Sequence, residues 1–204
     1  MKSNAGARND HLRIIAVGSS SKKAGKSSLA AHLVRELEAD YGLKVSSGGS
    51  HAEQHLIDDP EVVGKPGTDT GALMEAGAKR VLWLNTPPSR LAAELERALG
   101  TFAPGGLLVV EGNSALPHLT PDFTVFIMSV PFEEFKPSAG VALERADLVL
   151  MNRTGTLSDA EPAELKREIL ERSPNAKVIV YNDHMSLQDA LAETVVMAKR
   201  LLRQ

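Results

Sequence analysis

The sequence contains no cysteine among its 204 residues. Without thiols, the chain can form no disulfide, zinc–thiolate site or iron–sulfur cluster, and it has no cysteine nucleophile. Aromatic residues make up only 4% of the chain, which leaves few side chains on which nucleic-acid bases could stack. The 23 basic and 26 acidic residues nearly cancel, giving a net charge of -3. Because there is no basic excess, we expect no nucleic acid as a partner.

Long apolar runs are also missing, since no stretch approaches the ~18 apolar residues that a membrane-spanning helix needs. Segment 1–11 is polar and lacks the apolar centre of a signal peptide. We therefore expect this segment to be flexible, the protein to be cytoplasmic, and a membrane not to be among its partners. Hydrophobic residues make up 43%, which is ordinary for a globular protein, and the length predicts a single domain over residues 1–204.

Short apolar runs alternate with helical patterns along the chain. The strands expected from them are 12–17, 43–47, 80–84, 106–110, 123–130, 147–151 and 178–181. The expected helices are 26–39, 69–76, 89–99, 141–145, 158–172 and 186–201. Continuous apolar strands separated by helices predict a three-layer α/β fold, with a mainly parallel sheet of about seven strands covered by helices on both faces. In such sheets, ligands bind beyond the carboxyl ends of the strands.

Several residues are interpreted as the ends of these elements. Gly42 is expected to stop the first helix, and Ser89 and Ser158 are expected to cap later ones, the latter with Glu161 in a capping box. The segment Gly48 to Gly67 is polar and has no periodicity, so we interpret it as a long functional loop.

The clearest motif lies between the first expected strand and the first expected helix. It reads Gly18-Ser-Ser-Ser-Lys-Lys-Ala-Gly-Lys-Ser27, and its end matches the Gly-Lys-Ser of a phosphate-binding P-loop. Its beginning departs from the pattern, since Ser20 stands where the first glycine belongs. In such a loop, backbone N–H groups and the helix amino end attract phosphates. The expected nucleotide-binding residues here are Ser20, Ser21, Lys22, Lys23, Ala24, Gly25, Lys26, Ser27 and Ser28.

A P-loop site also needs an acidic residue at the end of a neighbouring strand to hold Mg²⁺. Glu111 fits, because it ends the apolar run 107–110 and precedes a glycine. In the long loop and just after it, Asp58, Asp59 and Asp69 are alternatives, of which Asp69 is favoured because it begins a helix. We therefore predict Ser27, Asp69 and Glu111 as Mg²⁺ ligands, and Lys26, Asp69 and Glu111 as the catalytic residues.

Three segments together resemble one family. They are Gly25-Lys26-Ser27, the stretch Lys65-Pro-Gly-Thr-Asp-Thr70 continuing to Ala78, and Val110-Glu111-Gly112. In their order they are similar to the molybdopterin-guanine dinucleotide biosynthesis protein B (MobB) family over roughly the first 115 residues. The resemblance implies a GTP-binding protein, with slow GTPase activity, that assists the attachment of GMP to molybdopterin. It also implies a homodimer, with molybdopterin or a cofactor-assembly protein as a further partner.

Two features depart from that family. Its His-rich segment is replaced here by a stretch that contains only His51 and His55. Their spacing of four would suit a metal site on a helix. The alternative interpretation is that both are solvated loop residues. The guanine-reading signature is incomplete, because Asn152 and Arg153 are followed by no aspartate at the expected place. Asn152 is a candidate to bond the base edge and Arg153 to stack on it, with Asn152 as a plain turn residue the alternative. GTP is favoured only through the resemblance, and ATP stays open.

Other functions fit the same scaffold. The stretch Leu143 to Asn152 resembles the corresponding turn of the lipid A tetraacyldisaccharide kinase, which favours an ATP-dependent small-molecule kinase or ligase. A nucleotide-binding metallochaperone is a further alternative. A degenerate scaffold that only binds a partner is disfavoured by the intact Lys26 and Ser27.

Overall fold

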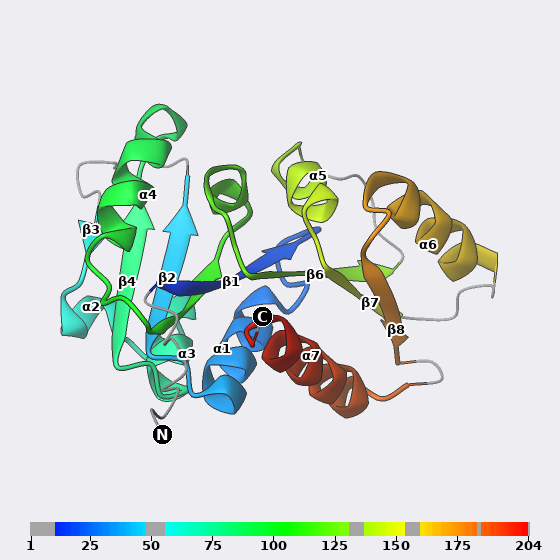
Figure 1. The fold of residues 1–204 in the computed structure, drawn as a ribbon, viewed down its shortest axis with the longest axis horizontal. Coiled ribbons are helices and arrows are strands. Elements are labelled where there is room, and N and C mark those ends of the chain that lie inside the picture. The colour runs from blue at the N-terminus through cyan, green and yellow to red at the C-terminus, as the bar shows by residue number, and fades with distance from the viewer. Residues whose placement is uncertain (1–10, 48–55, 131–136, 154–159, 183–184, 204) are drawn as a thin grey trace, which may run out of the picture.

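The structure is a computed structural model, and it describes residues 11–47, 56–130, 137–153, 160–182 and 185–203 (Figure 1). Its strands are β1 (Arg13–Ser19), β2 (Tyr41–Ser46), β3 (Leu56–Ile57), β4 (Arg80–Asn85), β5 (Leu107–Glu111), β6 (Phe123–Val130), β7 (Leu148–Arg153) and β8 (Lys177–Tyr181). Its α-helices are α1 (Lys26–Leu37), α2 (Pro60–Val63), α3 (Asp69–Glu75), α4 (Leu91–Leu99), α5 (Pro137–Glu144), α6 (Ala160–Arg172) and α7 (Leu187–Leu201). Two short 3-10 helices are η1 (Pro88–Arg90) and η2 (Asn113–His118).

The strands form one sheet in the order β3-β4-β2-β5-β1-β6-β7-β8. Every neighbouring pair is parallel except β3 with β4, which is antiparallel. The expected α/β class, parallel sheet and helical cover are confirmed, with eight strands rather than about seven. The central strand β1 lies between β5 and β6, so the residues after β1 and β5 meet at the same edge.

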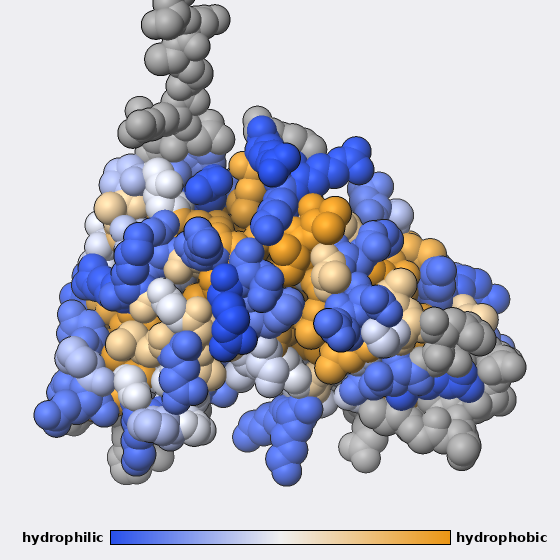
Figure 2. Space-filling view, turned by 90° about the horizontal axis from the view of Figure 1, so that it is seen from below, coloured by the Kyte–Doolittle hydropathy of each residue, from blue (hydrophilic) through white to orange (hydrophobic). Residues whose placement is uncertain are grey.

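Helices cover both faces of the sheet (Figure 1). Side chains of α4, η2, α5 and α6 pack on one face, and those of α1, α3 and α7 pack on the other, so two separate apolar clusters flank the sheet. Figure 2 views the second face, where patches of apolar side chains show between polar ones. Of the helices in the described residues, none is long and apolar enough to cross a membrane.

Three aspartates join the strands at the amino edge of the sheet. Asp40, Asp122 and Asp147 each accept a hydrogen bond from a backbone N–H near the start of a neighbouring strand, those of Leu107, Ile14 and Thr124 respectively, at 2.6 to 3.1 Å. A strand has no partner for some of its first N–H groups, and a carboxylate supplies one.

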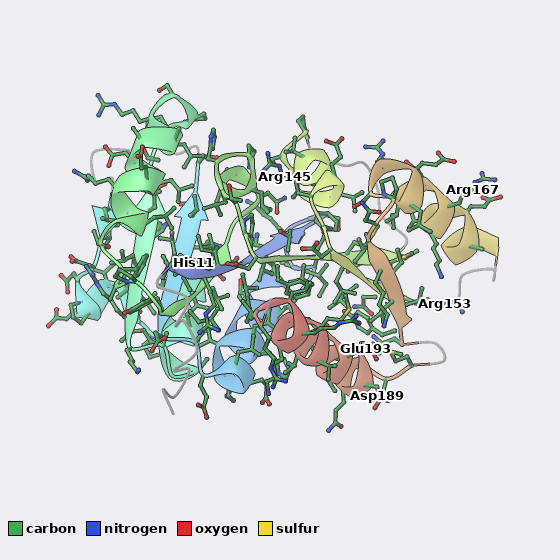
Figure 3. The ribbon with its side chains drawn as sticks, viewed as in Figure 1. His11, Arg145, Arg153, Arg167, Asp189 and Glu193 are labelled. Atoms are coloured by element: carbon green, nitrogen blue, oxygen red, sulfur yellow. The ribbon has the colours of Figure 1, made fainter. Side chains whose placement is uncertain are left out.

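Beside η2, the guanidinium of Arg145 donates to the carbonyls of Leu116 and Leu119 (Figure 3).

The ends of several elements differ from the sequence-based predictions. Gly42 lies within β2, while α1 ends before it with Glu38 in a left-handed conformation. A side chain at Gly42 would lie 3.1 to 3.3 Å from Leu73 and Val81, so this glycine allows α3 to approach the sheet. Ser89 lies in η1, and α4 begins after Arg90 without a side-chain cap.

The long loop expected over 48–67 is partly regular, because β3 and α2 lie within it. Strand β3 has two residues, and Asp59 caps the four-residue α2 through the N–H of Glu61. Elements this short leave no periodic pattern in a sequence. Ser158, His51, His55 and segment 1–10 lie outside the described residues, while His11 contacts Asp122.

Candidate functional site

A cavity of about 660 Å³ opens at the carboxyl edge of the sheet, beside the amino end of α1. It is bordered by the segment after β1, the end of β2, the start of α3 and the turn after β5. The lining residues are Ser19, Ser20, Ser21, Lys22, Lys23, Gly25, Lys26, Ser27, Ser28, Lys44, Val45, Ser46, Ser47, Asp69, Glu111, Gly112, Asn113, Ser114 and Ser138. Of the predicted phosphate-loop residues, all but the buried Ala24 line this cavity.

The loop after β1 turns tightly at two left-handed residues. Lys23 has φ 69° and Gly25 has φ 98°, and a side chain at Gly25 would also lie 3.3 Å from Ile127. Ser20 is not among the left-handed residues, and its N–H continues the pairing of β1 with β6 by donating to the Ile127 carbonyl. The serine that replaces the usual first glycine is therefore compatible with this backbone.

Helix α1 begins directly after this loop. Gly25 occupies its cap position, so no side chain caps the first N–H groups, and the first turn contains no acidic residue. The exposed N–H groups and the helix dipole favour an anion at this end of the 12-residue helix. Lys26 adds a cation at the same place.

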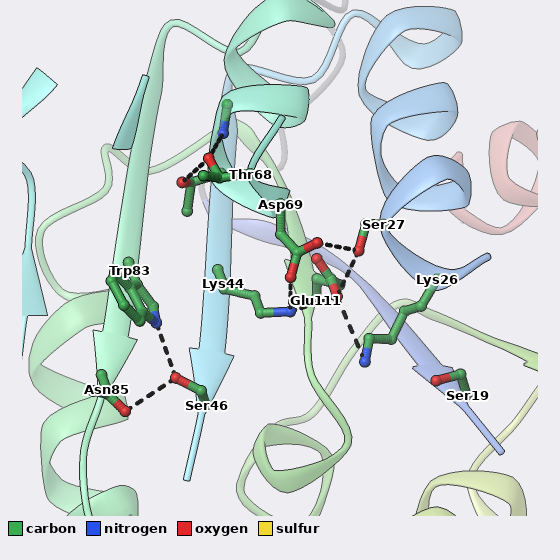
Figure 4. Close-up of polar contacts among 12 residues, drawn as sticks. Ser19, Lys26, Ser27, Lys44, Ser46, Thr68, Asp69, Trp83, Asn85 and Glu111 are labelled. Atoms are coloured by element: carbon green, nitrogen blue, oxygen red, sulfur yellow. Dashed lines mark hydrogen bonds and ion pairs between the residues drawn. The ribbon is translucent and has the colours of Figure 1, made fainter. Parts of the chain in front are cut away.

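Two carboxylates converge on the start of α1 (Figure 4). The Ser27 hydroxyl lies 2.6 Å from Asp69 Oδ1 and 3.2 Å from Glu111 Oε1. Lys26 Nζ lies 3.5 Å from Glu111 Oε1. The side chain of Glu111 is completely buried, so its polar contacts are with these neighbours rather than with bulk water. The structure thus brings together the residues that the sequence analysis proposed as Mg²⁺ ligands.

Lys44 completes the cluster, and the sequence analysis did not single it out. Its ammonium lies 2.5 Å from Asp69 Oδ2 and 2.7 Å from Glu111 Oε1. Lys44 and Glu111 are direct register partners on β2 and β5, so their side chains share a face of the sheet. A lysine between the two apolar residues of Leu43-Lys44-Val45 was the available signal, because a charge in a central strand needs a partner.

The segment before α3 presents Asp69 to the cluster. Thr68 caps α3 by accepting from the N–H of Gly71, and its own hydroxyl donates to the Lys65 carbonyl. A side chain at Gly71 would lie 2.1 Å from that carbonyl, and Gly67 has φ 77°. The two glycines and the threonine of this motif therefore serve a turn that places Asp69 beside Ser27.

The cluster shifts the pKa values of its members. Burial lowers the pKa of Lys26, and the attraction of Glu111 only partly offsets this effect. Burial also disfavours the charge on Lys44, but its contacts with Glu111 and Asp69 outweigh burial and raise its pKa. For Asp69, burial alone would raise the pKa, and the hydrogen bonds from Lys44 and Ser27 bring it below its ordinary value. The geometry therefore favours an ionised Asp69 and an ionised Lys44.

The donor set at this place fits Mg²⁺, the metal that the sequence analysis expects beside a P-loop. The hydroxyl of Ser27 has one proton for two carboxylate oxygens, and buried Glu111 Oε2 has no hydrogen-bond partner among the described residues. Hydroxyl and carboxylate oxygens are the ligands that Mg²⁺ prefers. Ser27, Asp69 and Glu111 could hold the ion once the ammonium of Lys44 leaves the carboxylates.

The other candidates lie elsewhere. Asn152 and Arg153 belong to β7 rather than following it, and they do not line this cavity; Figure 3 shows Arg153 on the β8 side of the sheet. Asn152 Oδ1 accepts from Asn182 Nδ2 at 2.6 Å. Asp58 lies 3.7 Å from Arg80, and neither Asp58 nor Asp59 lines the cavity. The role of Asn152 and Arg153 in reading a base stays a prediction.

A second polar group lies beside the cluster (Figure 4). Trp83 Nε1 donates to the Ser46 hydroxyl at 2.9 Å, and that hydroxyl donates to Asn85 Oδ1 at 3.1 Å. These two hydrogen bonds link the end of β2 to the end of β4 next to the cavity. Sequence reasoning did not detect this polar group, because its three residues lie on two strands that are neighbours only in the folded sheet.

Comparisons with known proteins support the fold. No protein-family model and no curated protein sequence matches the chain. Among solved structures, HypB from Helicobacter pylori in complex with nickel matches with a TM-score of 0.56 and 15% identity, over 95% of this chain and 88% of that one. The hydrogenase maturation factor HypB from Archaeoglobus fulgidus matches with a TM-score of 0.52 and 15% identity, over 94% and 90%. A Cyanothece McdA variant in complex with ATP matches with a TM-score of 0.51 and 10% identity, over 95% and 97%. At these identities the likeness shows that this chain has the α/β fold of the P-loop NTPases, and no more than that.

Proposed function

We propose that this protein binds a nucleoside triphosphate together with Mg²⁺, as a single P-loop nucleotide-binding domain, and hydrolyses it slowly by itself. Lys26 and the backbone N–H groups of residues 20–28 bind the phosphates. Ser27, Asp69 and Glu111 hold the metal. When bound there, Mg²⁺ would supply the positive charge that neutralises the terminal phosphates.

The observation that carries this proposal is the convergence of three separate segments at one helix amino end. Ser27 Oγ, at the start of α1, lies 2.6 Å from Asp69 and 3.2 Å from Glu111, and these two come from α3 and β5. Lys26 and Lys44 balance the two carboxylates themselves, so a bound polyphosphate brings negative charge that favours a further cation beside the carboxylates. The combination therefore suits an anion that arrives with a divalent cation.

Calorimetry with ATP and GTP, each with and without Mg²⁺, tests the proposal. We expect micromolar binding that strengthens with Mg²⁺ and is weakened at least 100-fold in Lys26→Ala, because the variant loses the loop's phosphate cation. Lys79→Ala is the control, since Lys79 pairs with Asp40 outside the cavity. Unchanged affinity in a folded Lys26→Ala protein would remove the P-loop assignment.

The finer proposal is that the nucleotide is GTP and that the protein is an accessory factor of molybdenum cofactor assembly. Its support is the segment 65–78, whose similarity to the MobB family coincides with the turn that presents Asp69. We expect GTP to bind more tightly than ATP and the protein to raise the yield of molybdopterin guanine dinucleotide from GTP and molybdopterin. Equal yields with wild type and Lys26→Ala would contradict this role.

A second candidate is transfer of the terminal phosphoryl group to a small molecule. The observation that favours it is that Ser46, Ser47, Ser114 and Ser138 also line the cavity, in addition to the residues proposed to bind phosphate and metal. A polar lining beyond those residues suits an acceptor bound beside the phosphates. Nucleotide turnover that rises only with an added acceptor would favour this activity over slow hydrolysis.

A further inference from the structure

Lys44 is placed as a metal ion would be placed in this cavity. Its ammonium contacts one oxygen of each carboxylate, Asp69 Oδ2 and Glu111 Oε1 (Figure 4). Ser27 contacts Asp69 through the other oxygen and shares Glu111 Oε1 with Lys44. The ammonium therefore bridges the same two carboxylates that the proposed Mg²⁺ would need.

The charges in the cluster balance without a metal. Counted as formal charges, Lys26 and Lys44 contribute two positive charges, and Asp69 and Glu111 contribute two negative ones. A divalent cation entering alone would leave two ammonium groups beside it with no additional anion. The cost is greatest at Glu111, whose side chain is fully buried beside the 16% exposed Lys44, and smaller at Asp69, whose side chain is 45% exposed.

We propose that Lys44 is a built-in counter-ion that occupies the metal's carboxylates in the nucleotide-free protein, so that a divalent metal enters only together with the nucleotide. The inference rests on the proposed function. A triphosphate supplies the negative charge that offsets the excess positive charge created when the metal joins the two lysines. Lys44 then exchanges its carboxylate partners for phosphate oxygens, which lie within reach because Lys44 and Lys26 line the same cavity.

A purely structural ion pair is the alternative role for Lys44. In that case, removing the lysine would lower stability and would not change which cations the site accepts. The two roles therefore differ in metal affinity measured without nucleotide, which is a quantity independent of turnover.

The test measures Mn²⁺ binding by electron paramagnetic resonance, with no nucleotide present, in wild type and in Lys44→Met. We expect Lys44→Met to bind Mn²⁺ at least ten-fold more tightly than wild type. With a non-hydrolysable triphosphate present, the difference should shrink to less than three-fold, because the phosphates then offset the charge of Lys44. Equal Mn²⁺ affinity in the two proteins without nucleotide would overturn the proposal.

Two further variants separate occupancy of the carboxylates from a general charge effect. Lys26→Met also removes a cation near Glu111, but Lys26 lies 3.5 Å from Oε1 and makes no contact with Asp69 within salt-bridge distance. We expect it to raise Mn²⁺ affinity by less than three-fold, and a rise equal to that of Lys44→Met would count against the proposal. Lys79→Met, outside the cavity, should leave the affinity unchanged.

Variants that retain the shape of the side chain guard against misfolding. If Lys44→Met fails to fold, Lys44→Gln serves in its place, while Lys44→Arg keeps the charge and should exclude Mn²⁺ as wild type does. Free entry of Mn²⁺ into Lys44→Arg would argue against the counter-ion role. Failure of wild type to bind any triphosphate would remove the proposed function, while the nucleotide-free Mn²⁺ comparison would still decide the role of Lys44.

Discussion

The side chain of Asn113 pairs with the main chain of Ser19 in both directions. The N–H of Ser19 donates to Asn113 Oδ1, and Asn113 Nδ2 donates to the Ser19 carbonyl, each at 2.8 Å. Ser19 is the last residue of β1, and Asn113 follows the glycine after β5. The amide thus extends the pairing of β1 with β5 by one step, up to the point where the phosphate loop begins.

Asn113→Ala tests this pairing. Ser19 is only 2% exposed, so the variant leaves a buried N–H and a buried carbonyl without these partners. We expect the free energy of unfolding to fall by about 1–3 kcal/mol in urea titrations and nucleotide affinity to fall as well. Asn175→Ala, at an exposed turn before β8, is the matched control. A loss of stability without a loss of affinity would mean that the loop keeps its shape without Asn113.

Glu111→Gln separates the metal from the nucleotide. The change keeps the size of the buried side chain and removes its charge, so we expect the Mg²⁺ concentration at half-maximal binding to rise at least ten-fold. Nucleotide affinity without Mg²⁺ should change little. Glu94→Gln on α4, whose carboxylate pairs with Arg97 away from the cavity, should behave as wild type. The same Mg²⁺ midpoint in Glu111→Gln and wild type would make Asp69 the principal metal residue.

Gly71→Ala tests the turn that presents Asp69. Its new methyl group would lie 2.1 Å from the Lys65 carbonyl, so the turn or the helix must shift. We expect a destabilisation of about 1–3 kcal/mol and a weaker Mg²⁺ dependence of nucleotide binding. Gly100→Ala is the control, because its backbone is right-handed and the nearest atoms lie at 3.6 Å. There, thermal unfolding should show a stability unchanged or raised by up to about 1 kcal/mol.

Asp40 predicts a pH dependence of stability away from the cavity. The hydrogen bond from Lys79 lowers the pKa of this carboxyl below its ordinary value, and the N–H of Leu107 adds to the effect. A depressed folded-state pKa means that the stabilisation is present above the unfolded pKa of about 3.9 and is lost as the pH falls through the folded value. We therefore expect the stability difference between wild type and Asp40→Asn to be larger at pH 6 than at pH 3.

Urea titrations at the two pH values measure this difference. In a Lys79→Met background, which removes the largest cause of the shift, the contribution of Asp40 should vary less with pH. A difference that is the same at pH 3 and pH 6 in the wild-type background would contradict the role of the ion pair.

Much of the fold was readable from local patterns. Phe123 to Val130 was predicted as a strand with its observed ends, because a mostly apolar run of this length between polar turns is typical of a strand buried in a parallel sheet. Helix α7 was predicted over 186–201 and is observed over Leu187–Leu201, with Ser186 outside it as a cap that accepts from the N–H of Asp189. By contrast, Gly42 was misread as a helix stop, because its small size serves the approach of Leu73 from α3, a contact distant in sequence.

For the site, the sequence by itself determined most of the residues that we propose to bind phosphate and metal. A Gly-Lys-Ser turn between a strand and a helix, and a glutamate that ends an apolar strand, are local features that need no partner to be recognised. Only the tertiary structure decided that Lys44 bridges Asp69 and Glu111 and that Asn113 holds Ser19. These contacts depend on the strand order, which sets β2 and β1 on either side of β5. The sequence gives the strands in chain order, whereas the charged side chains pair between strands that are neighbours only in the folded sheet.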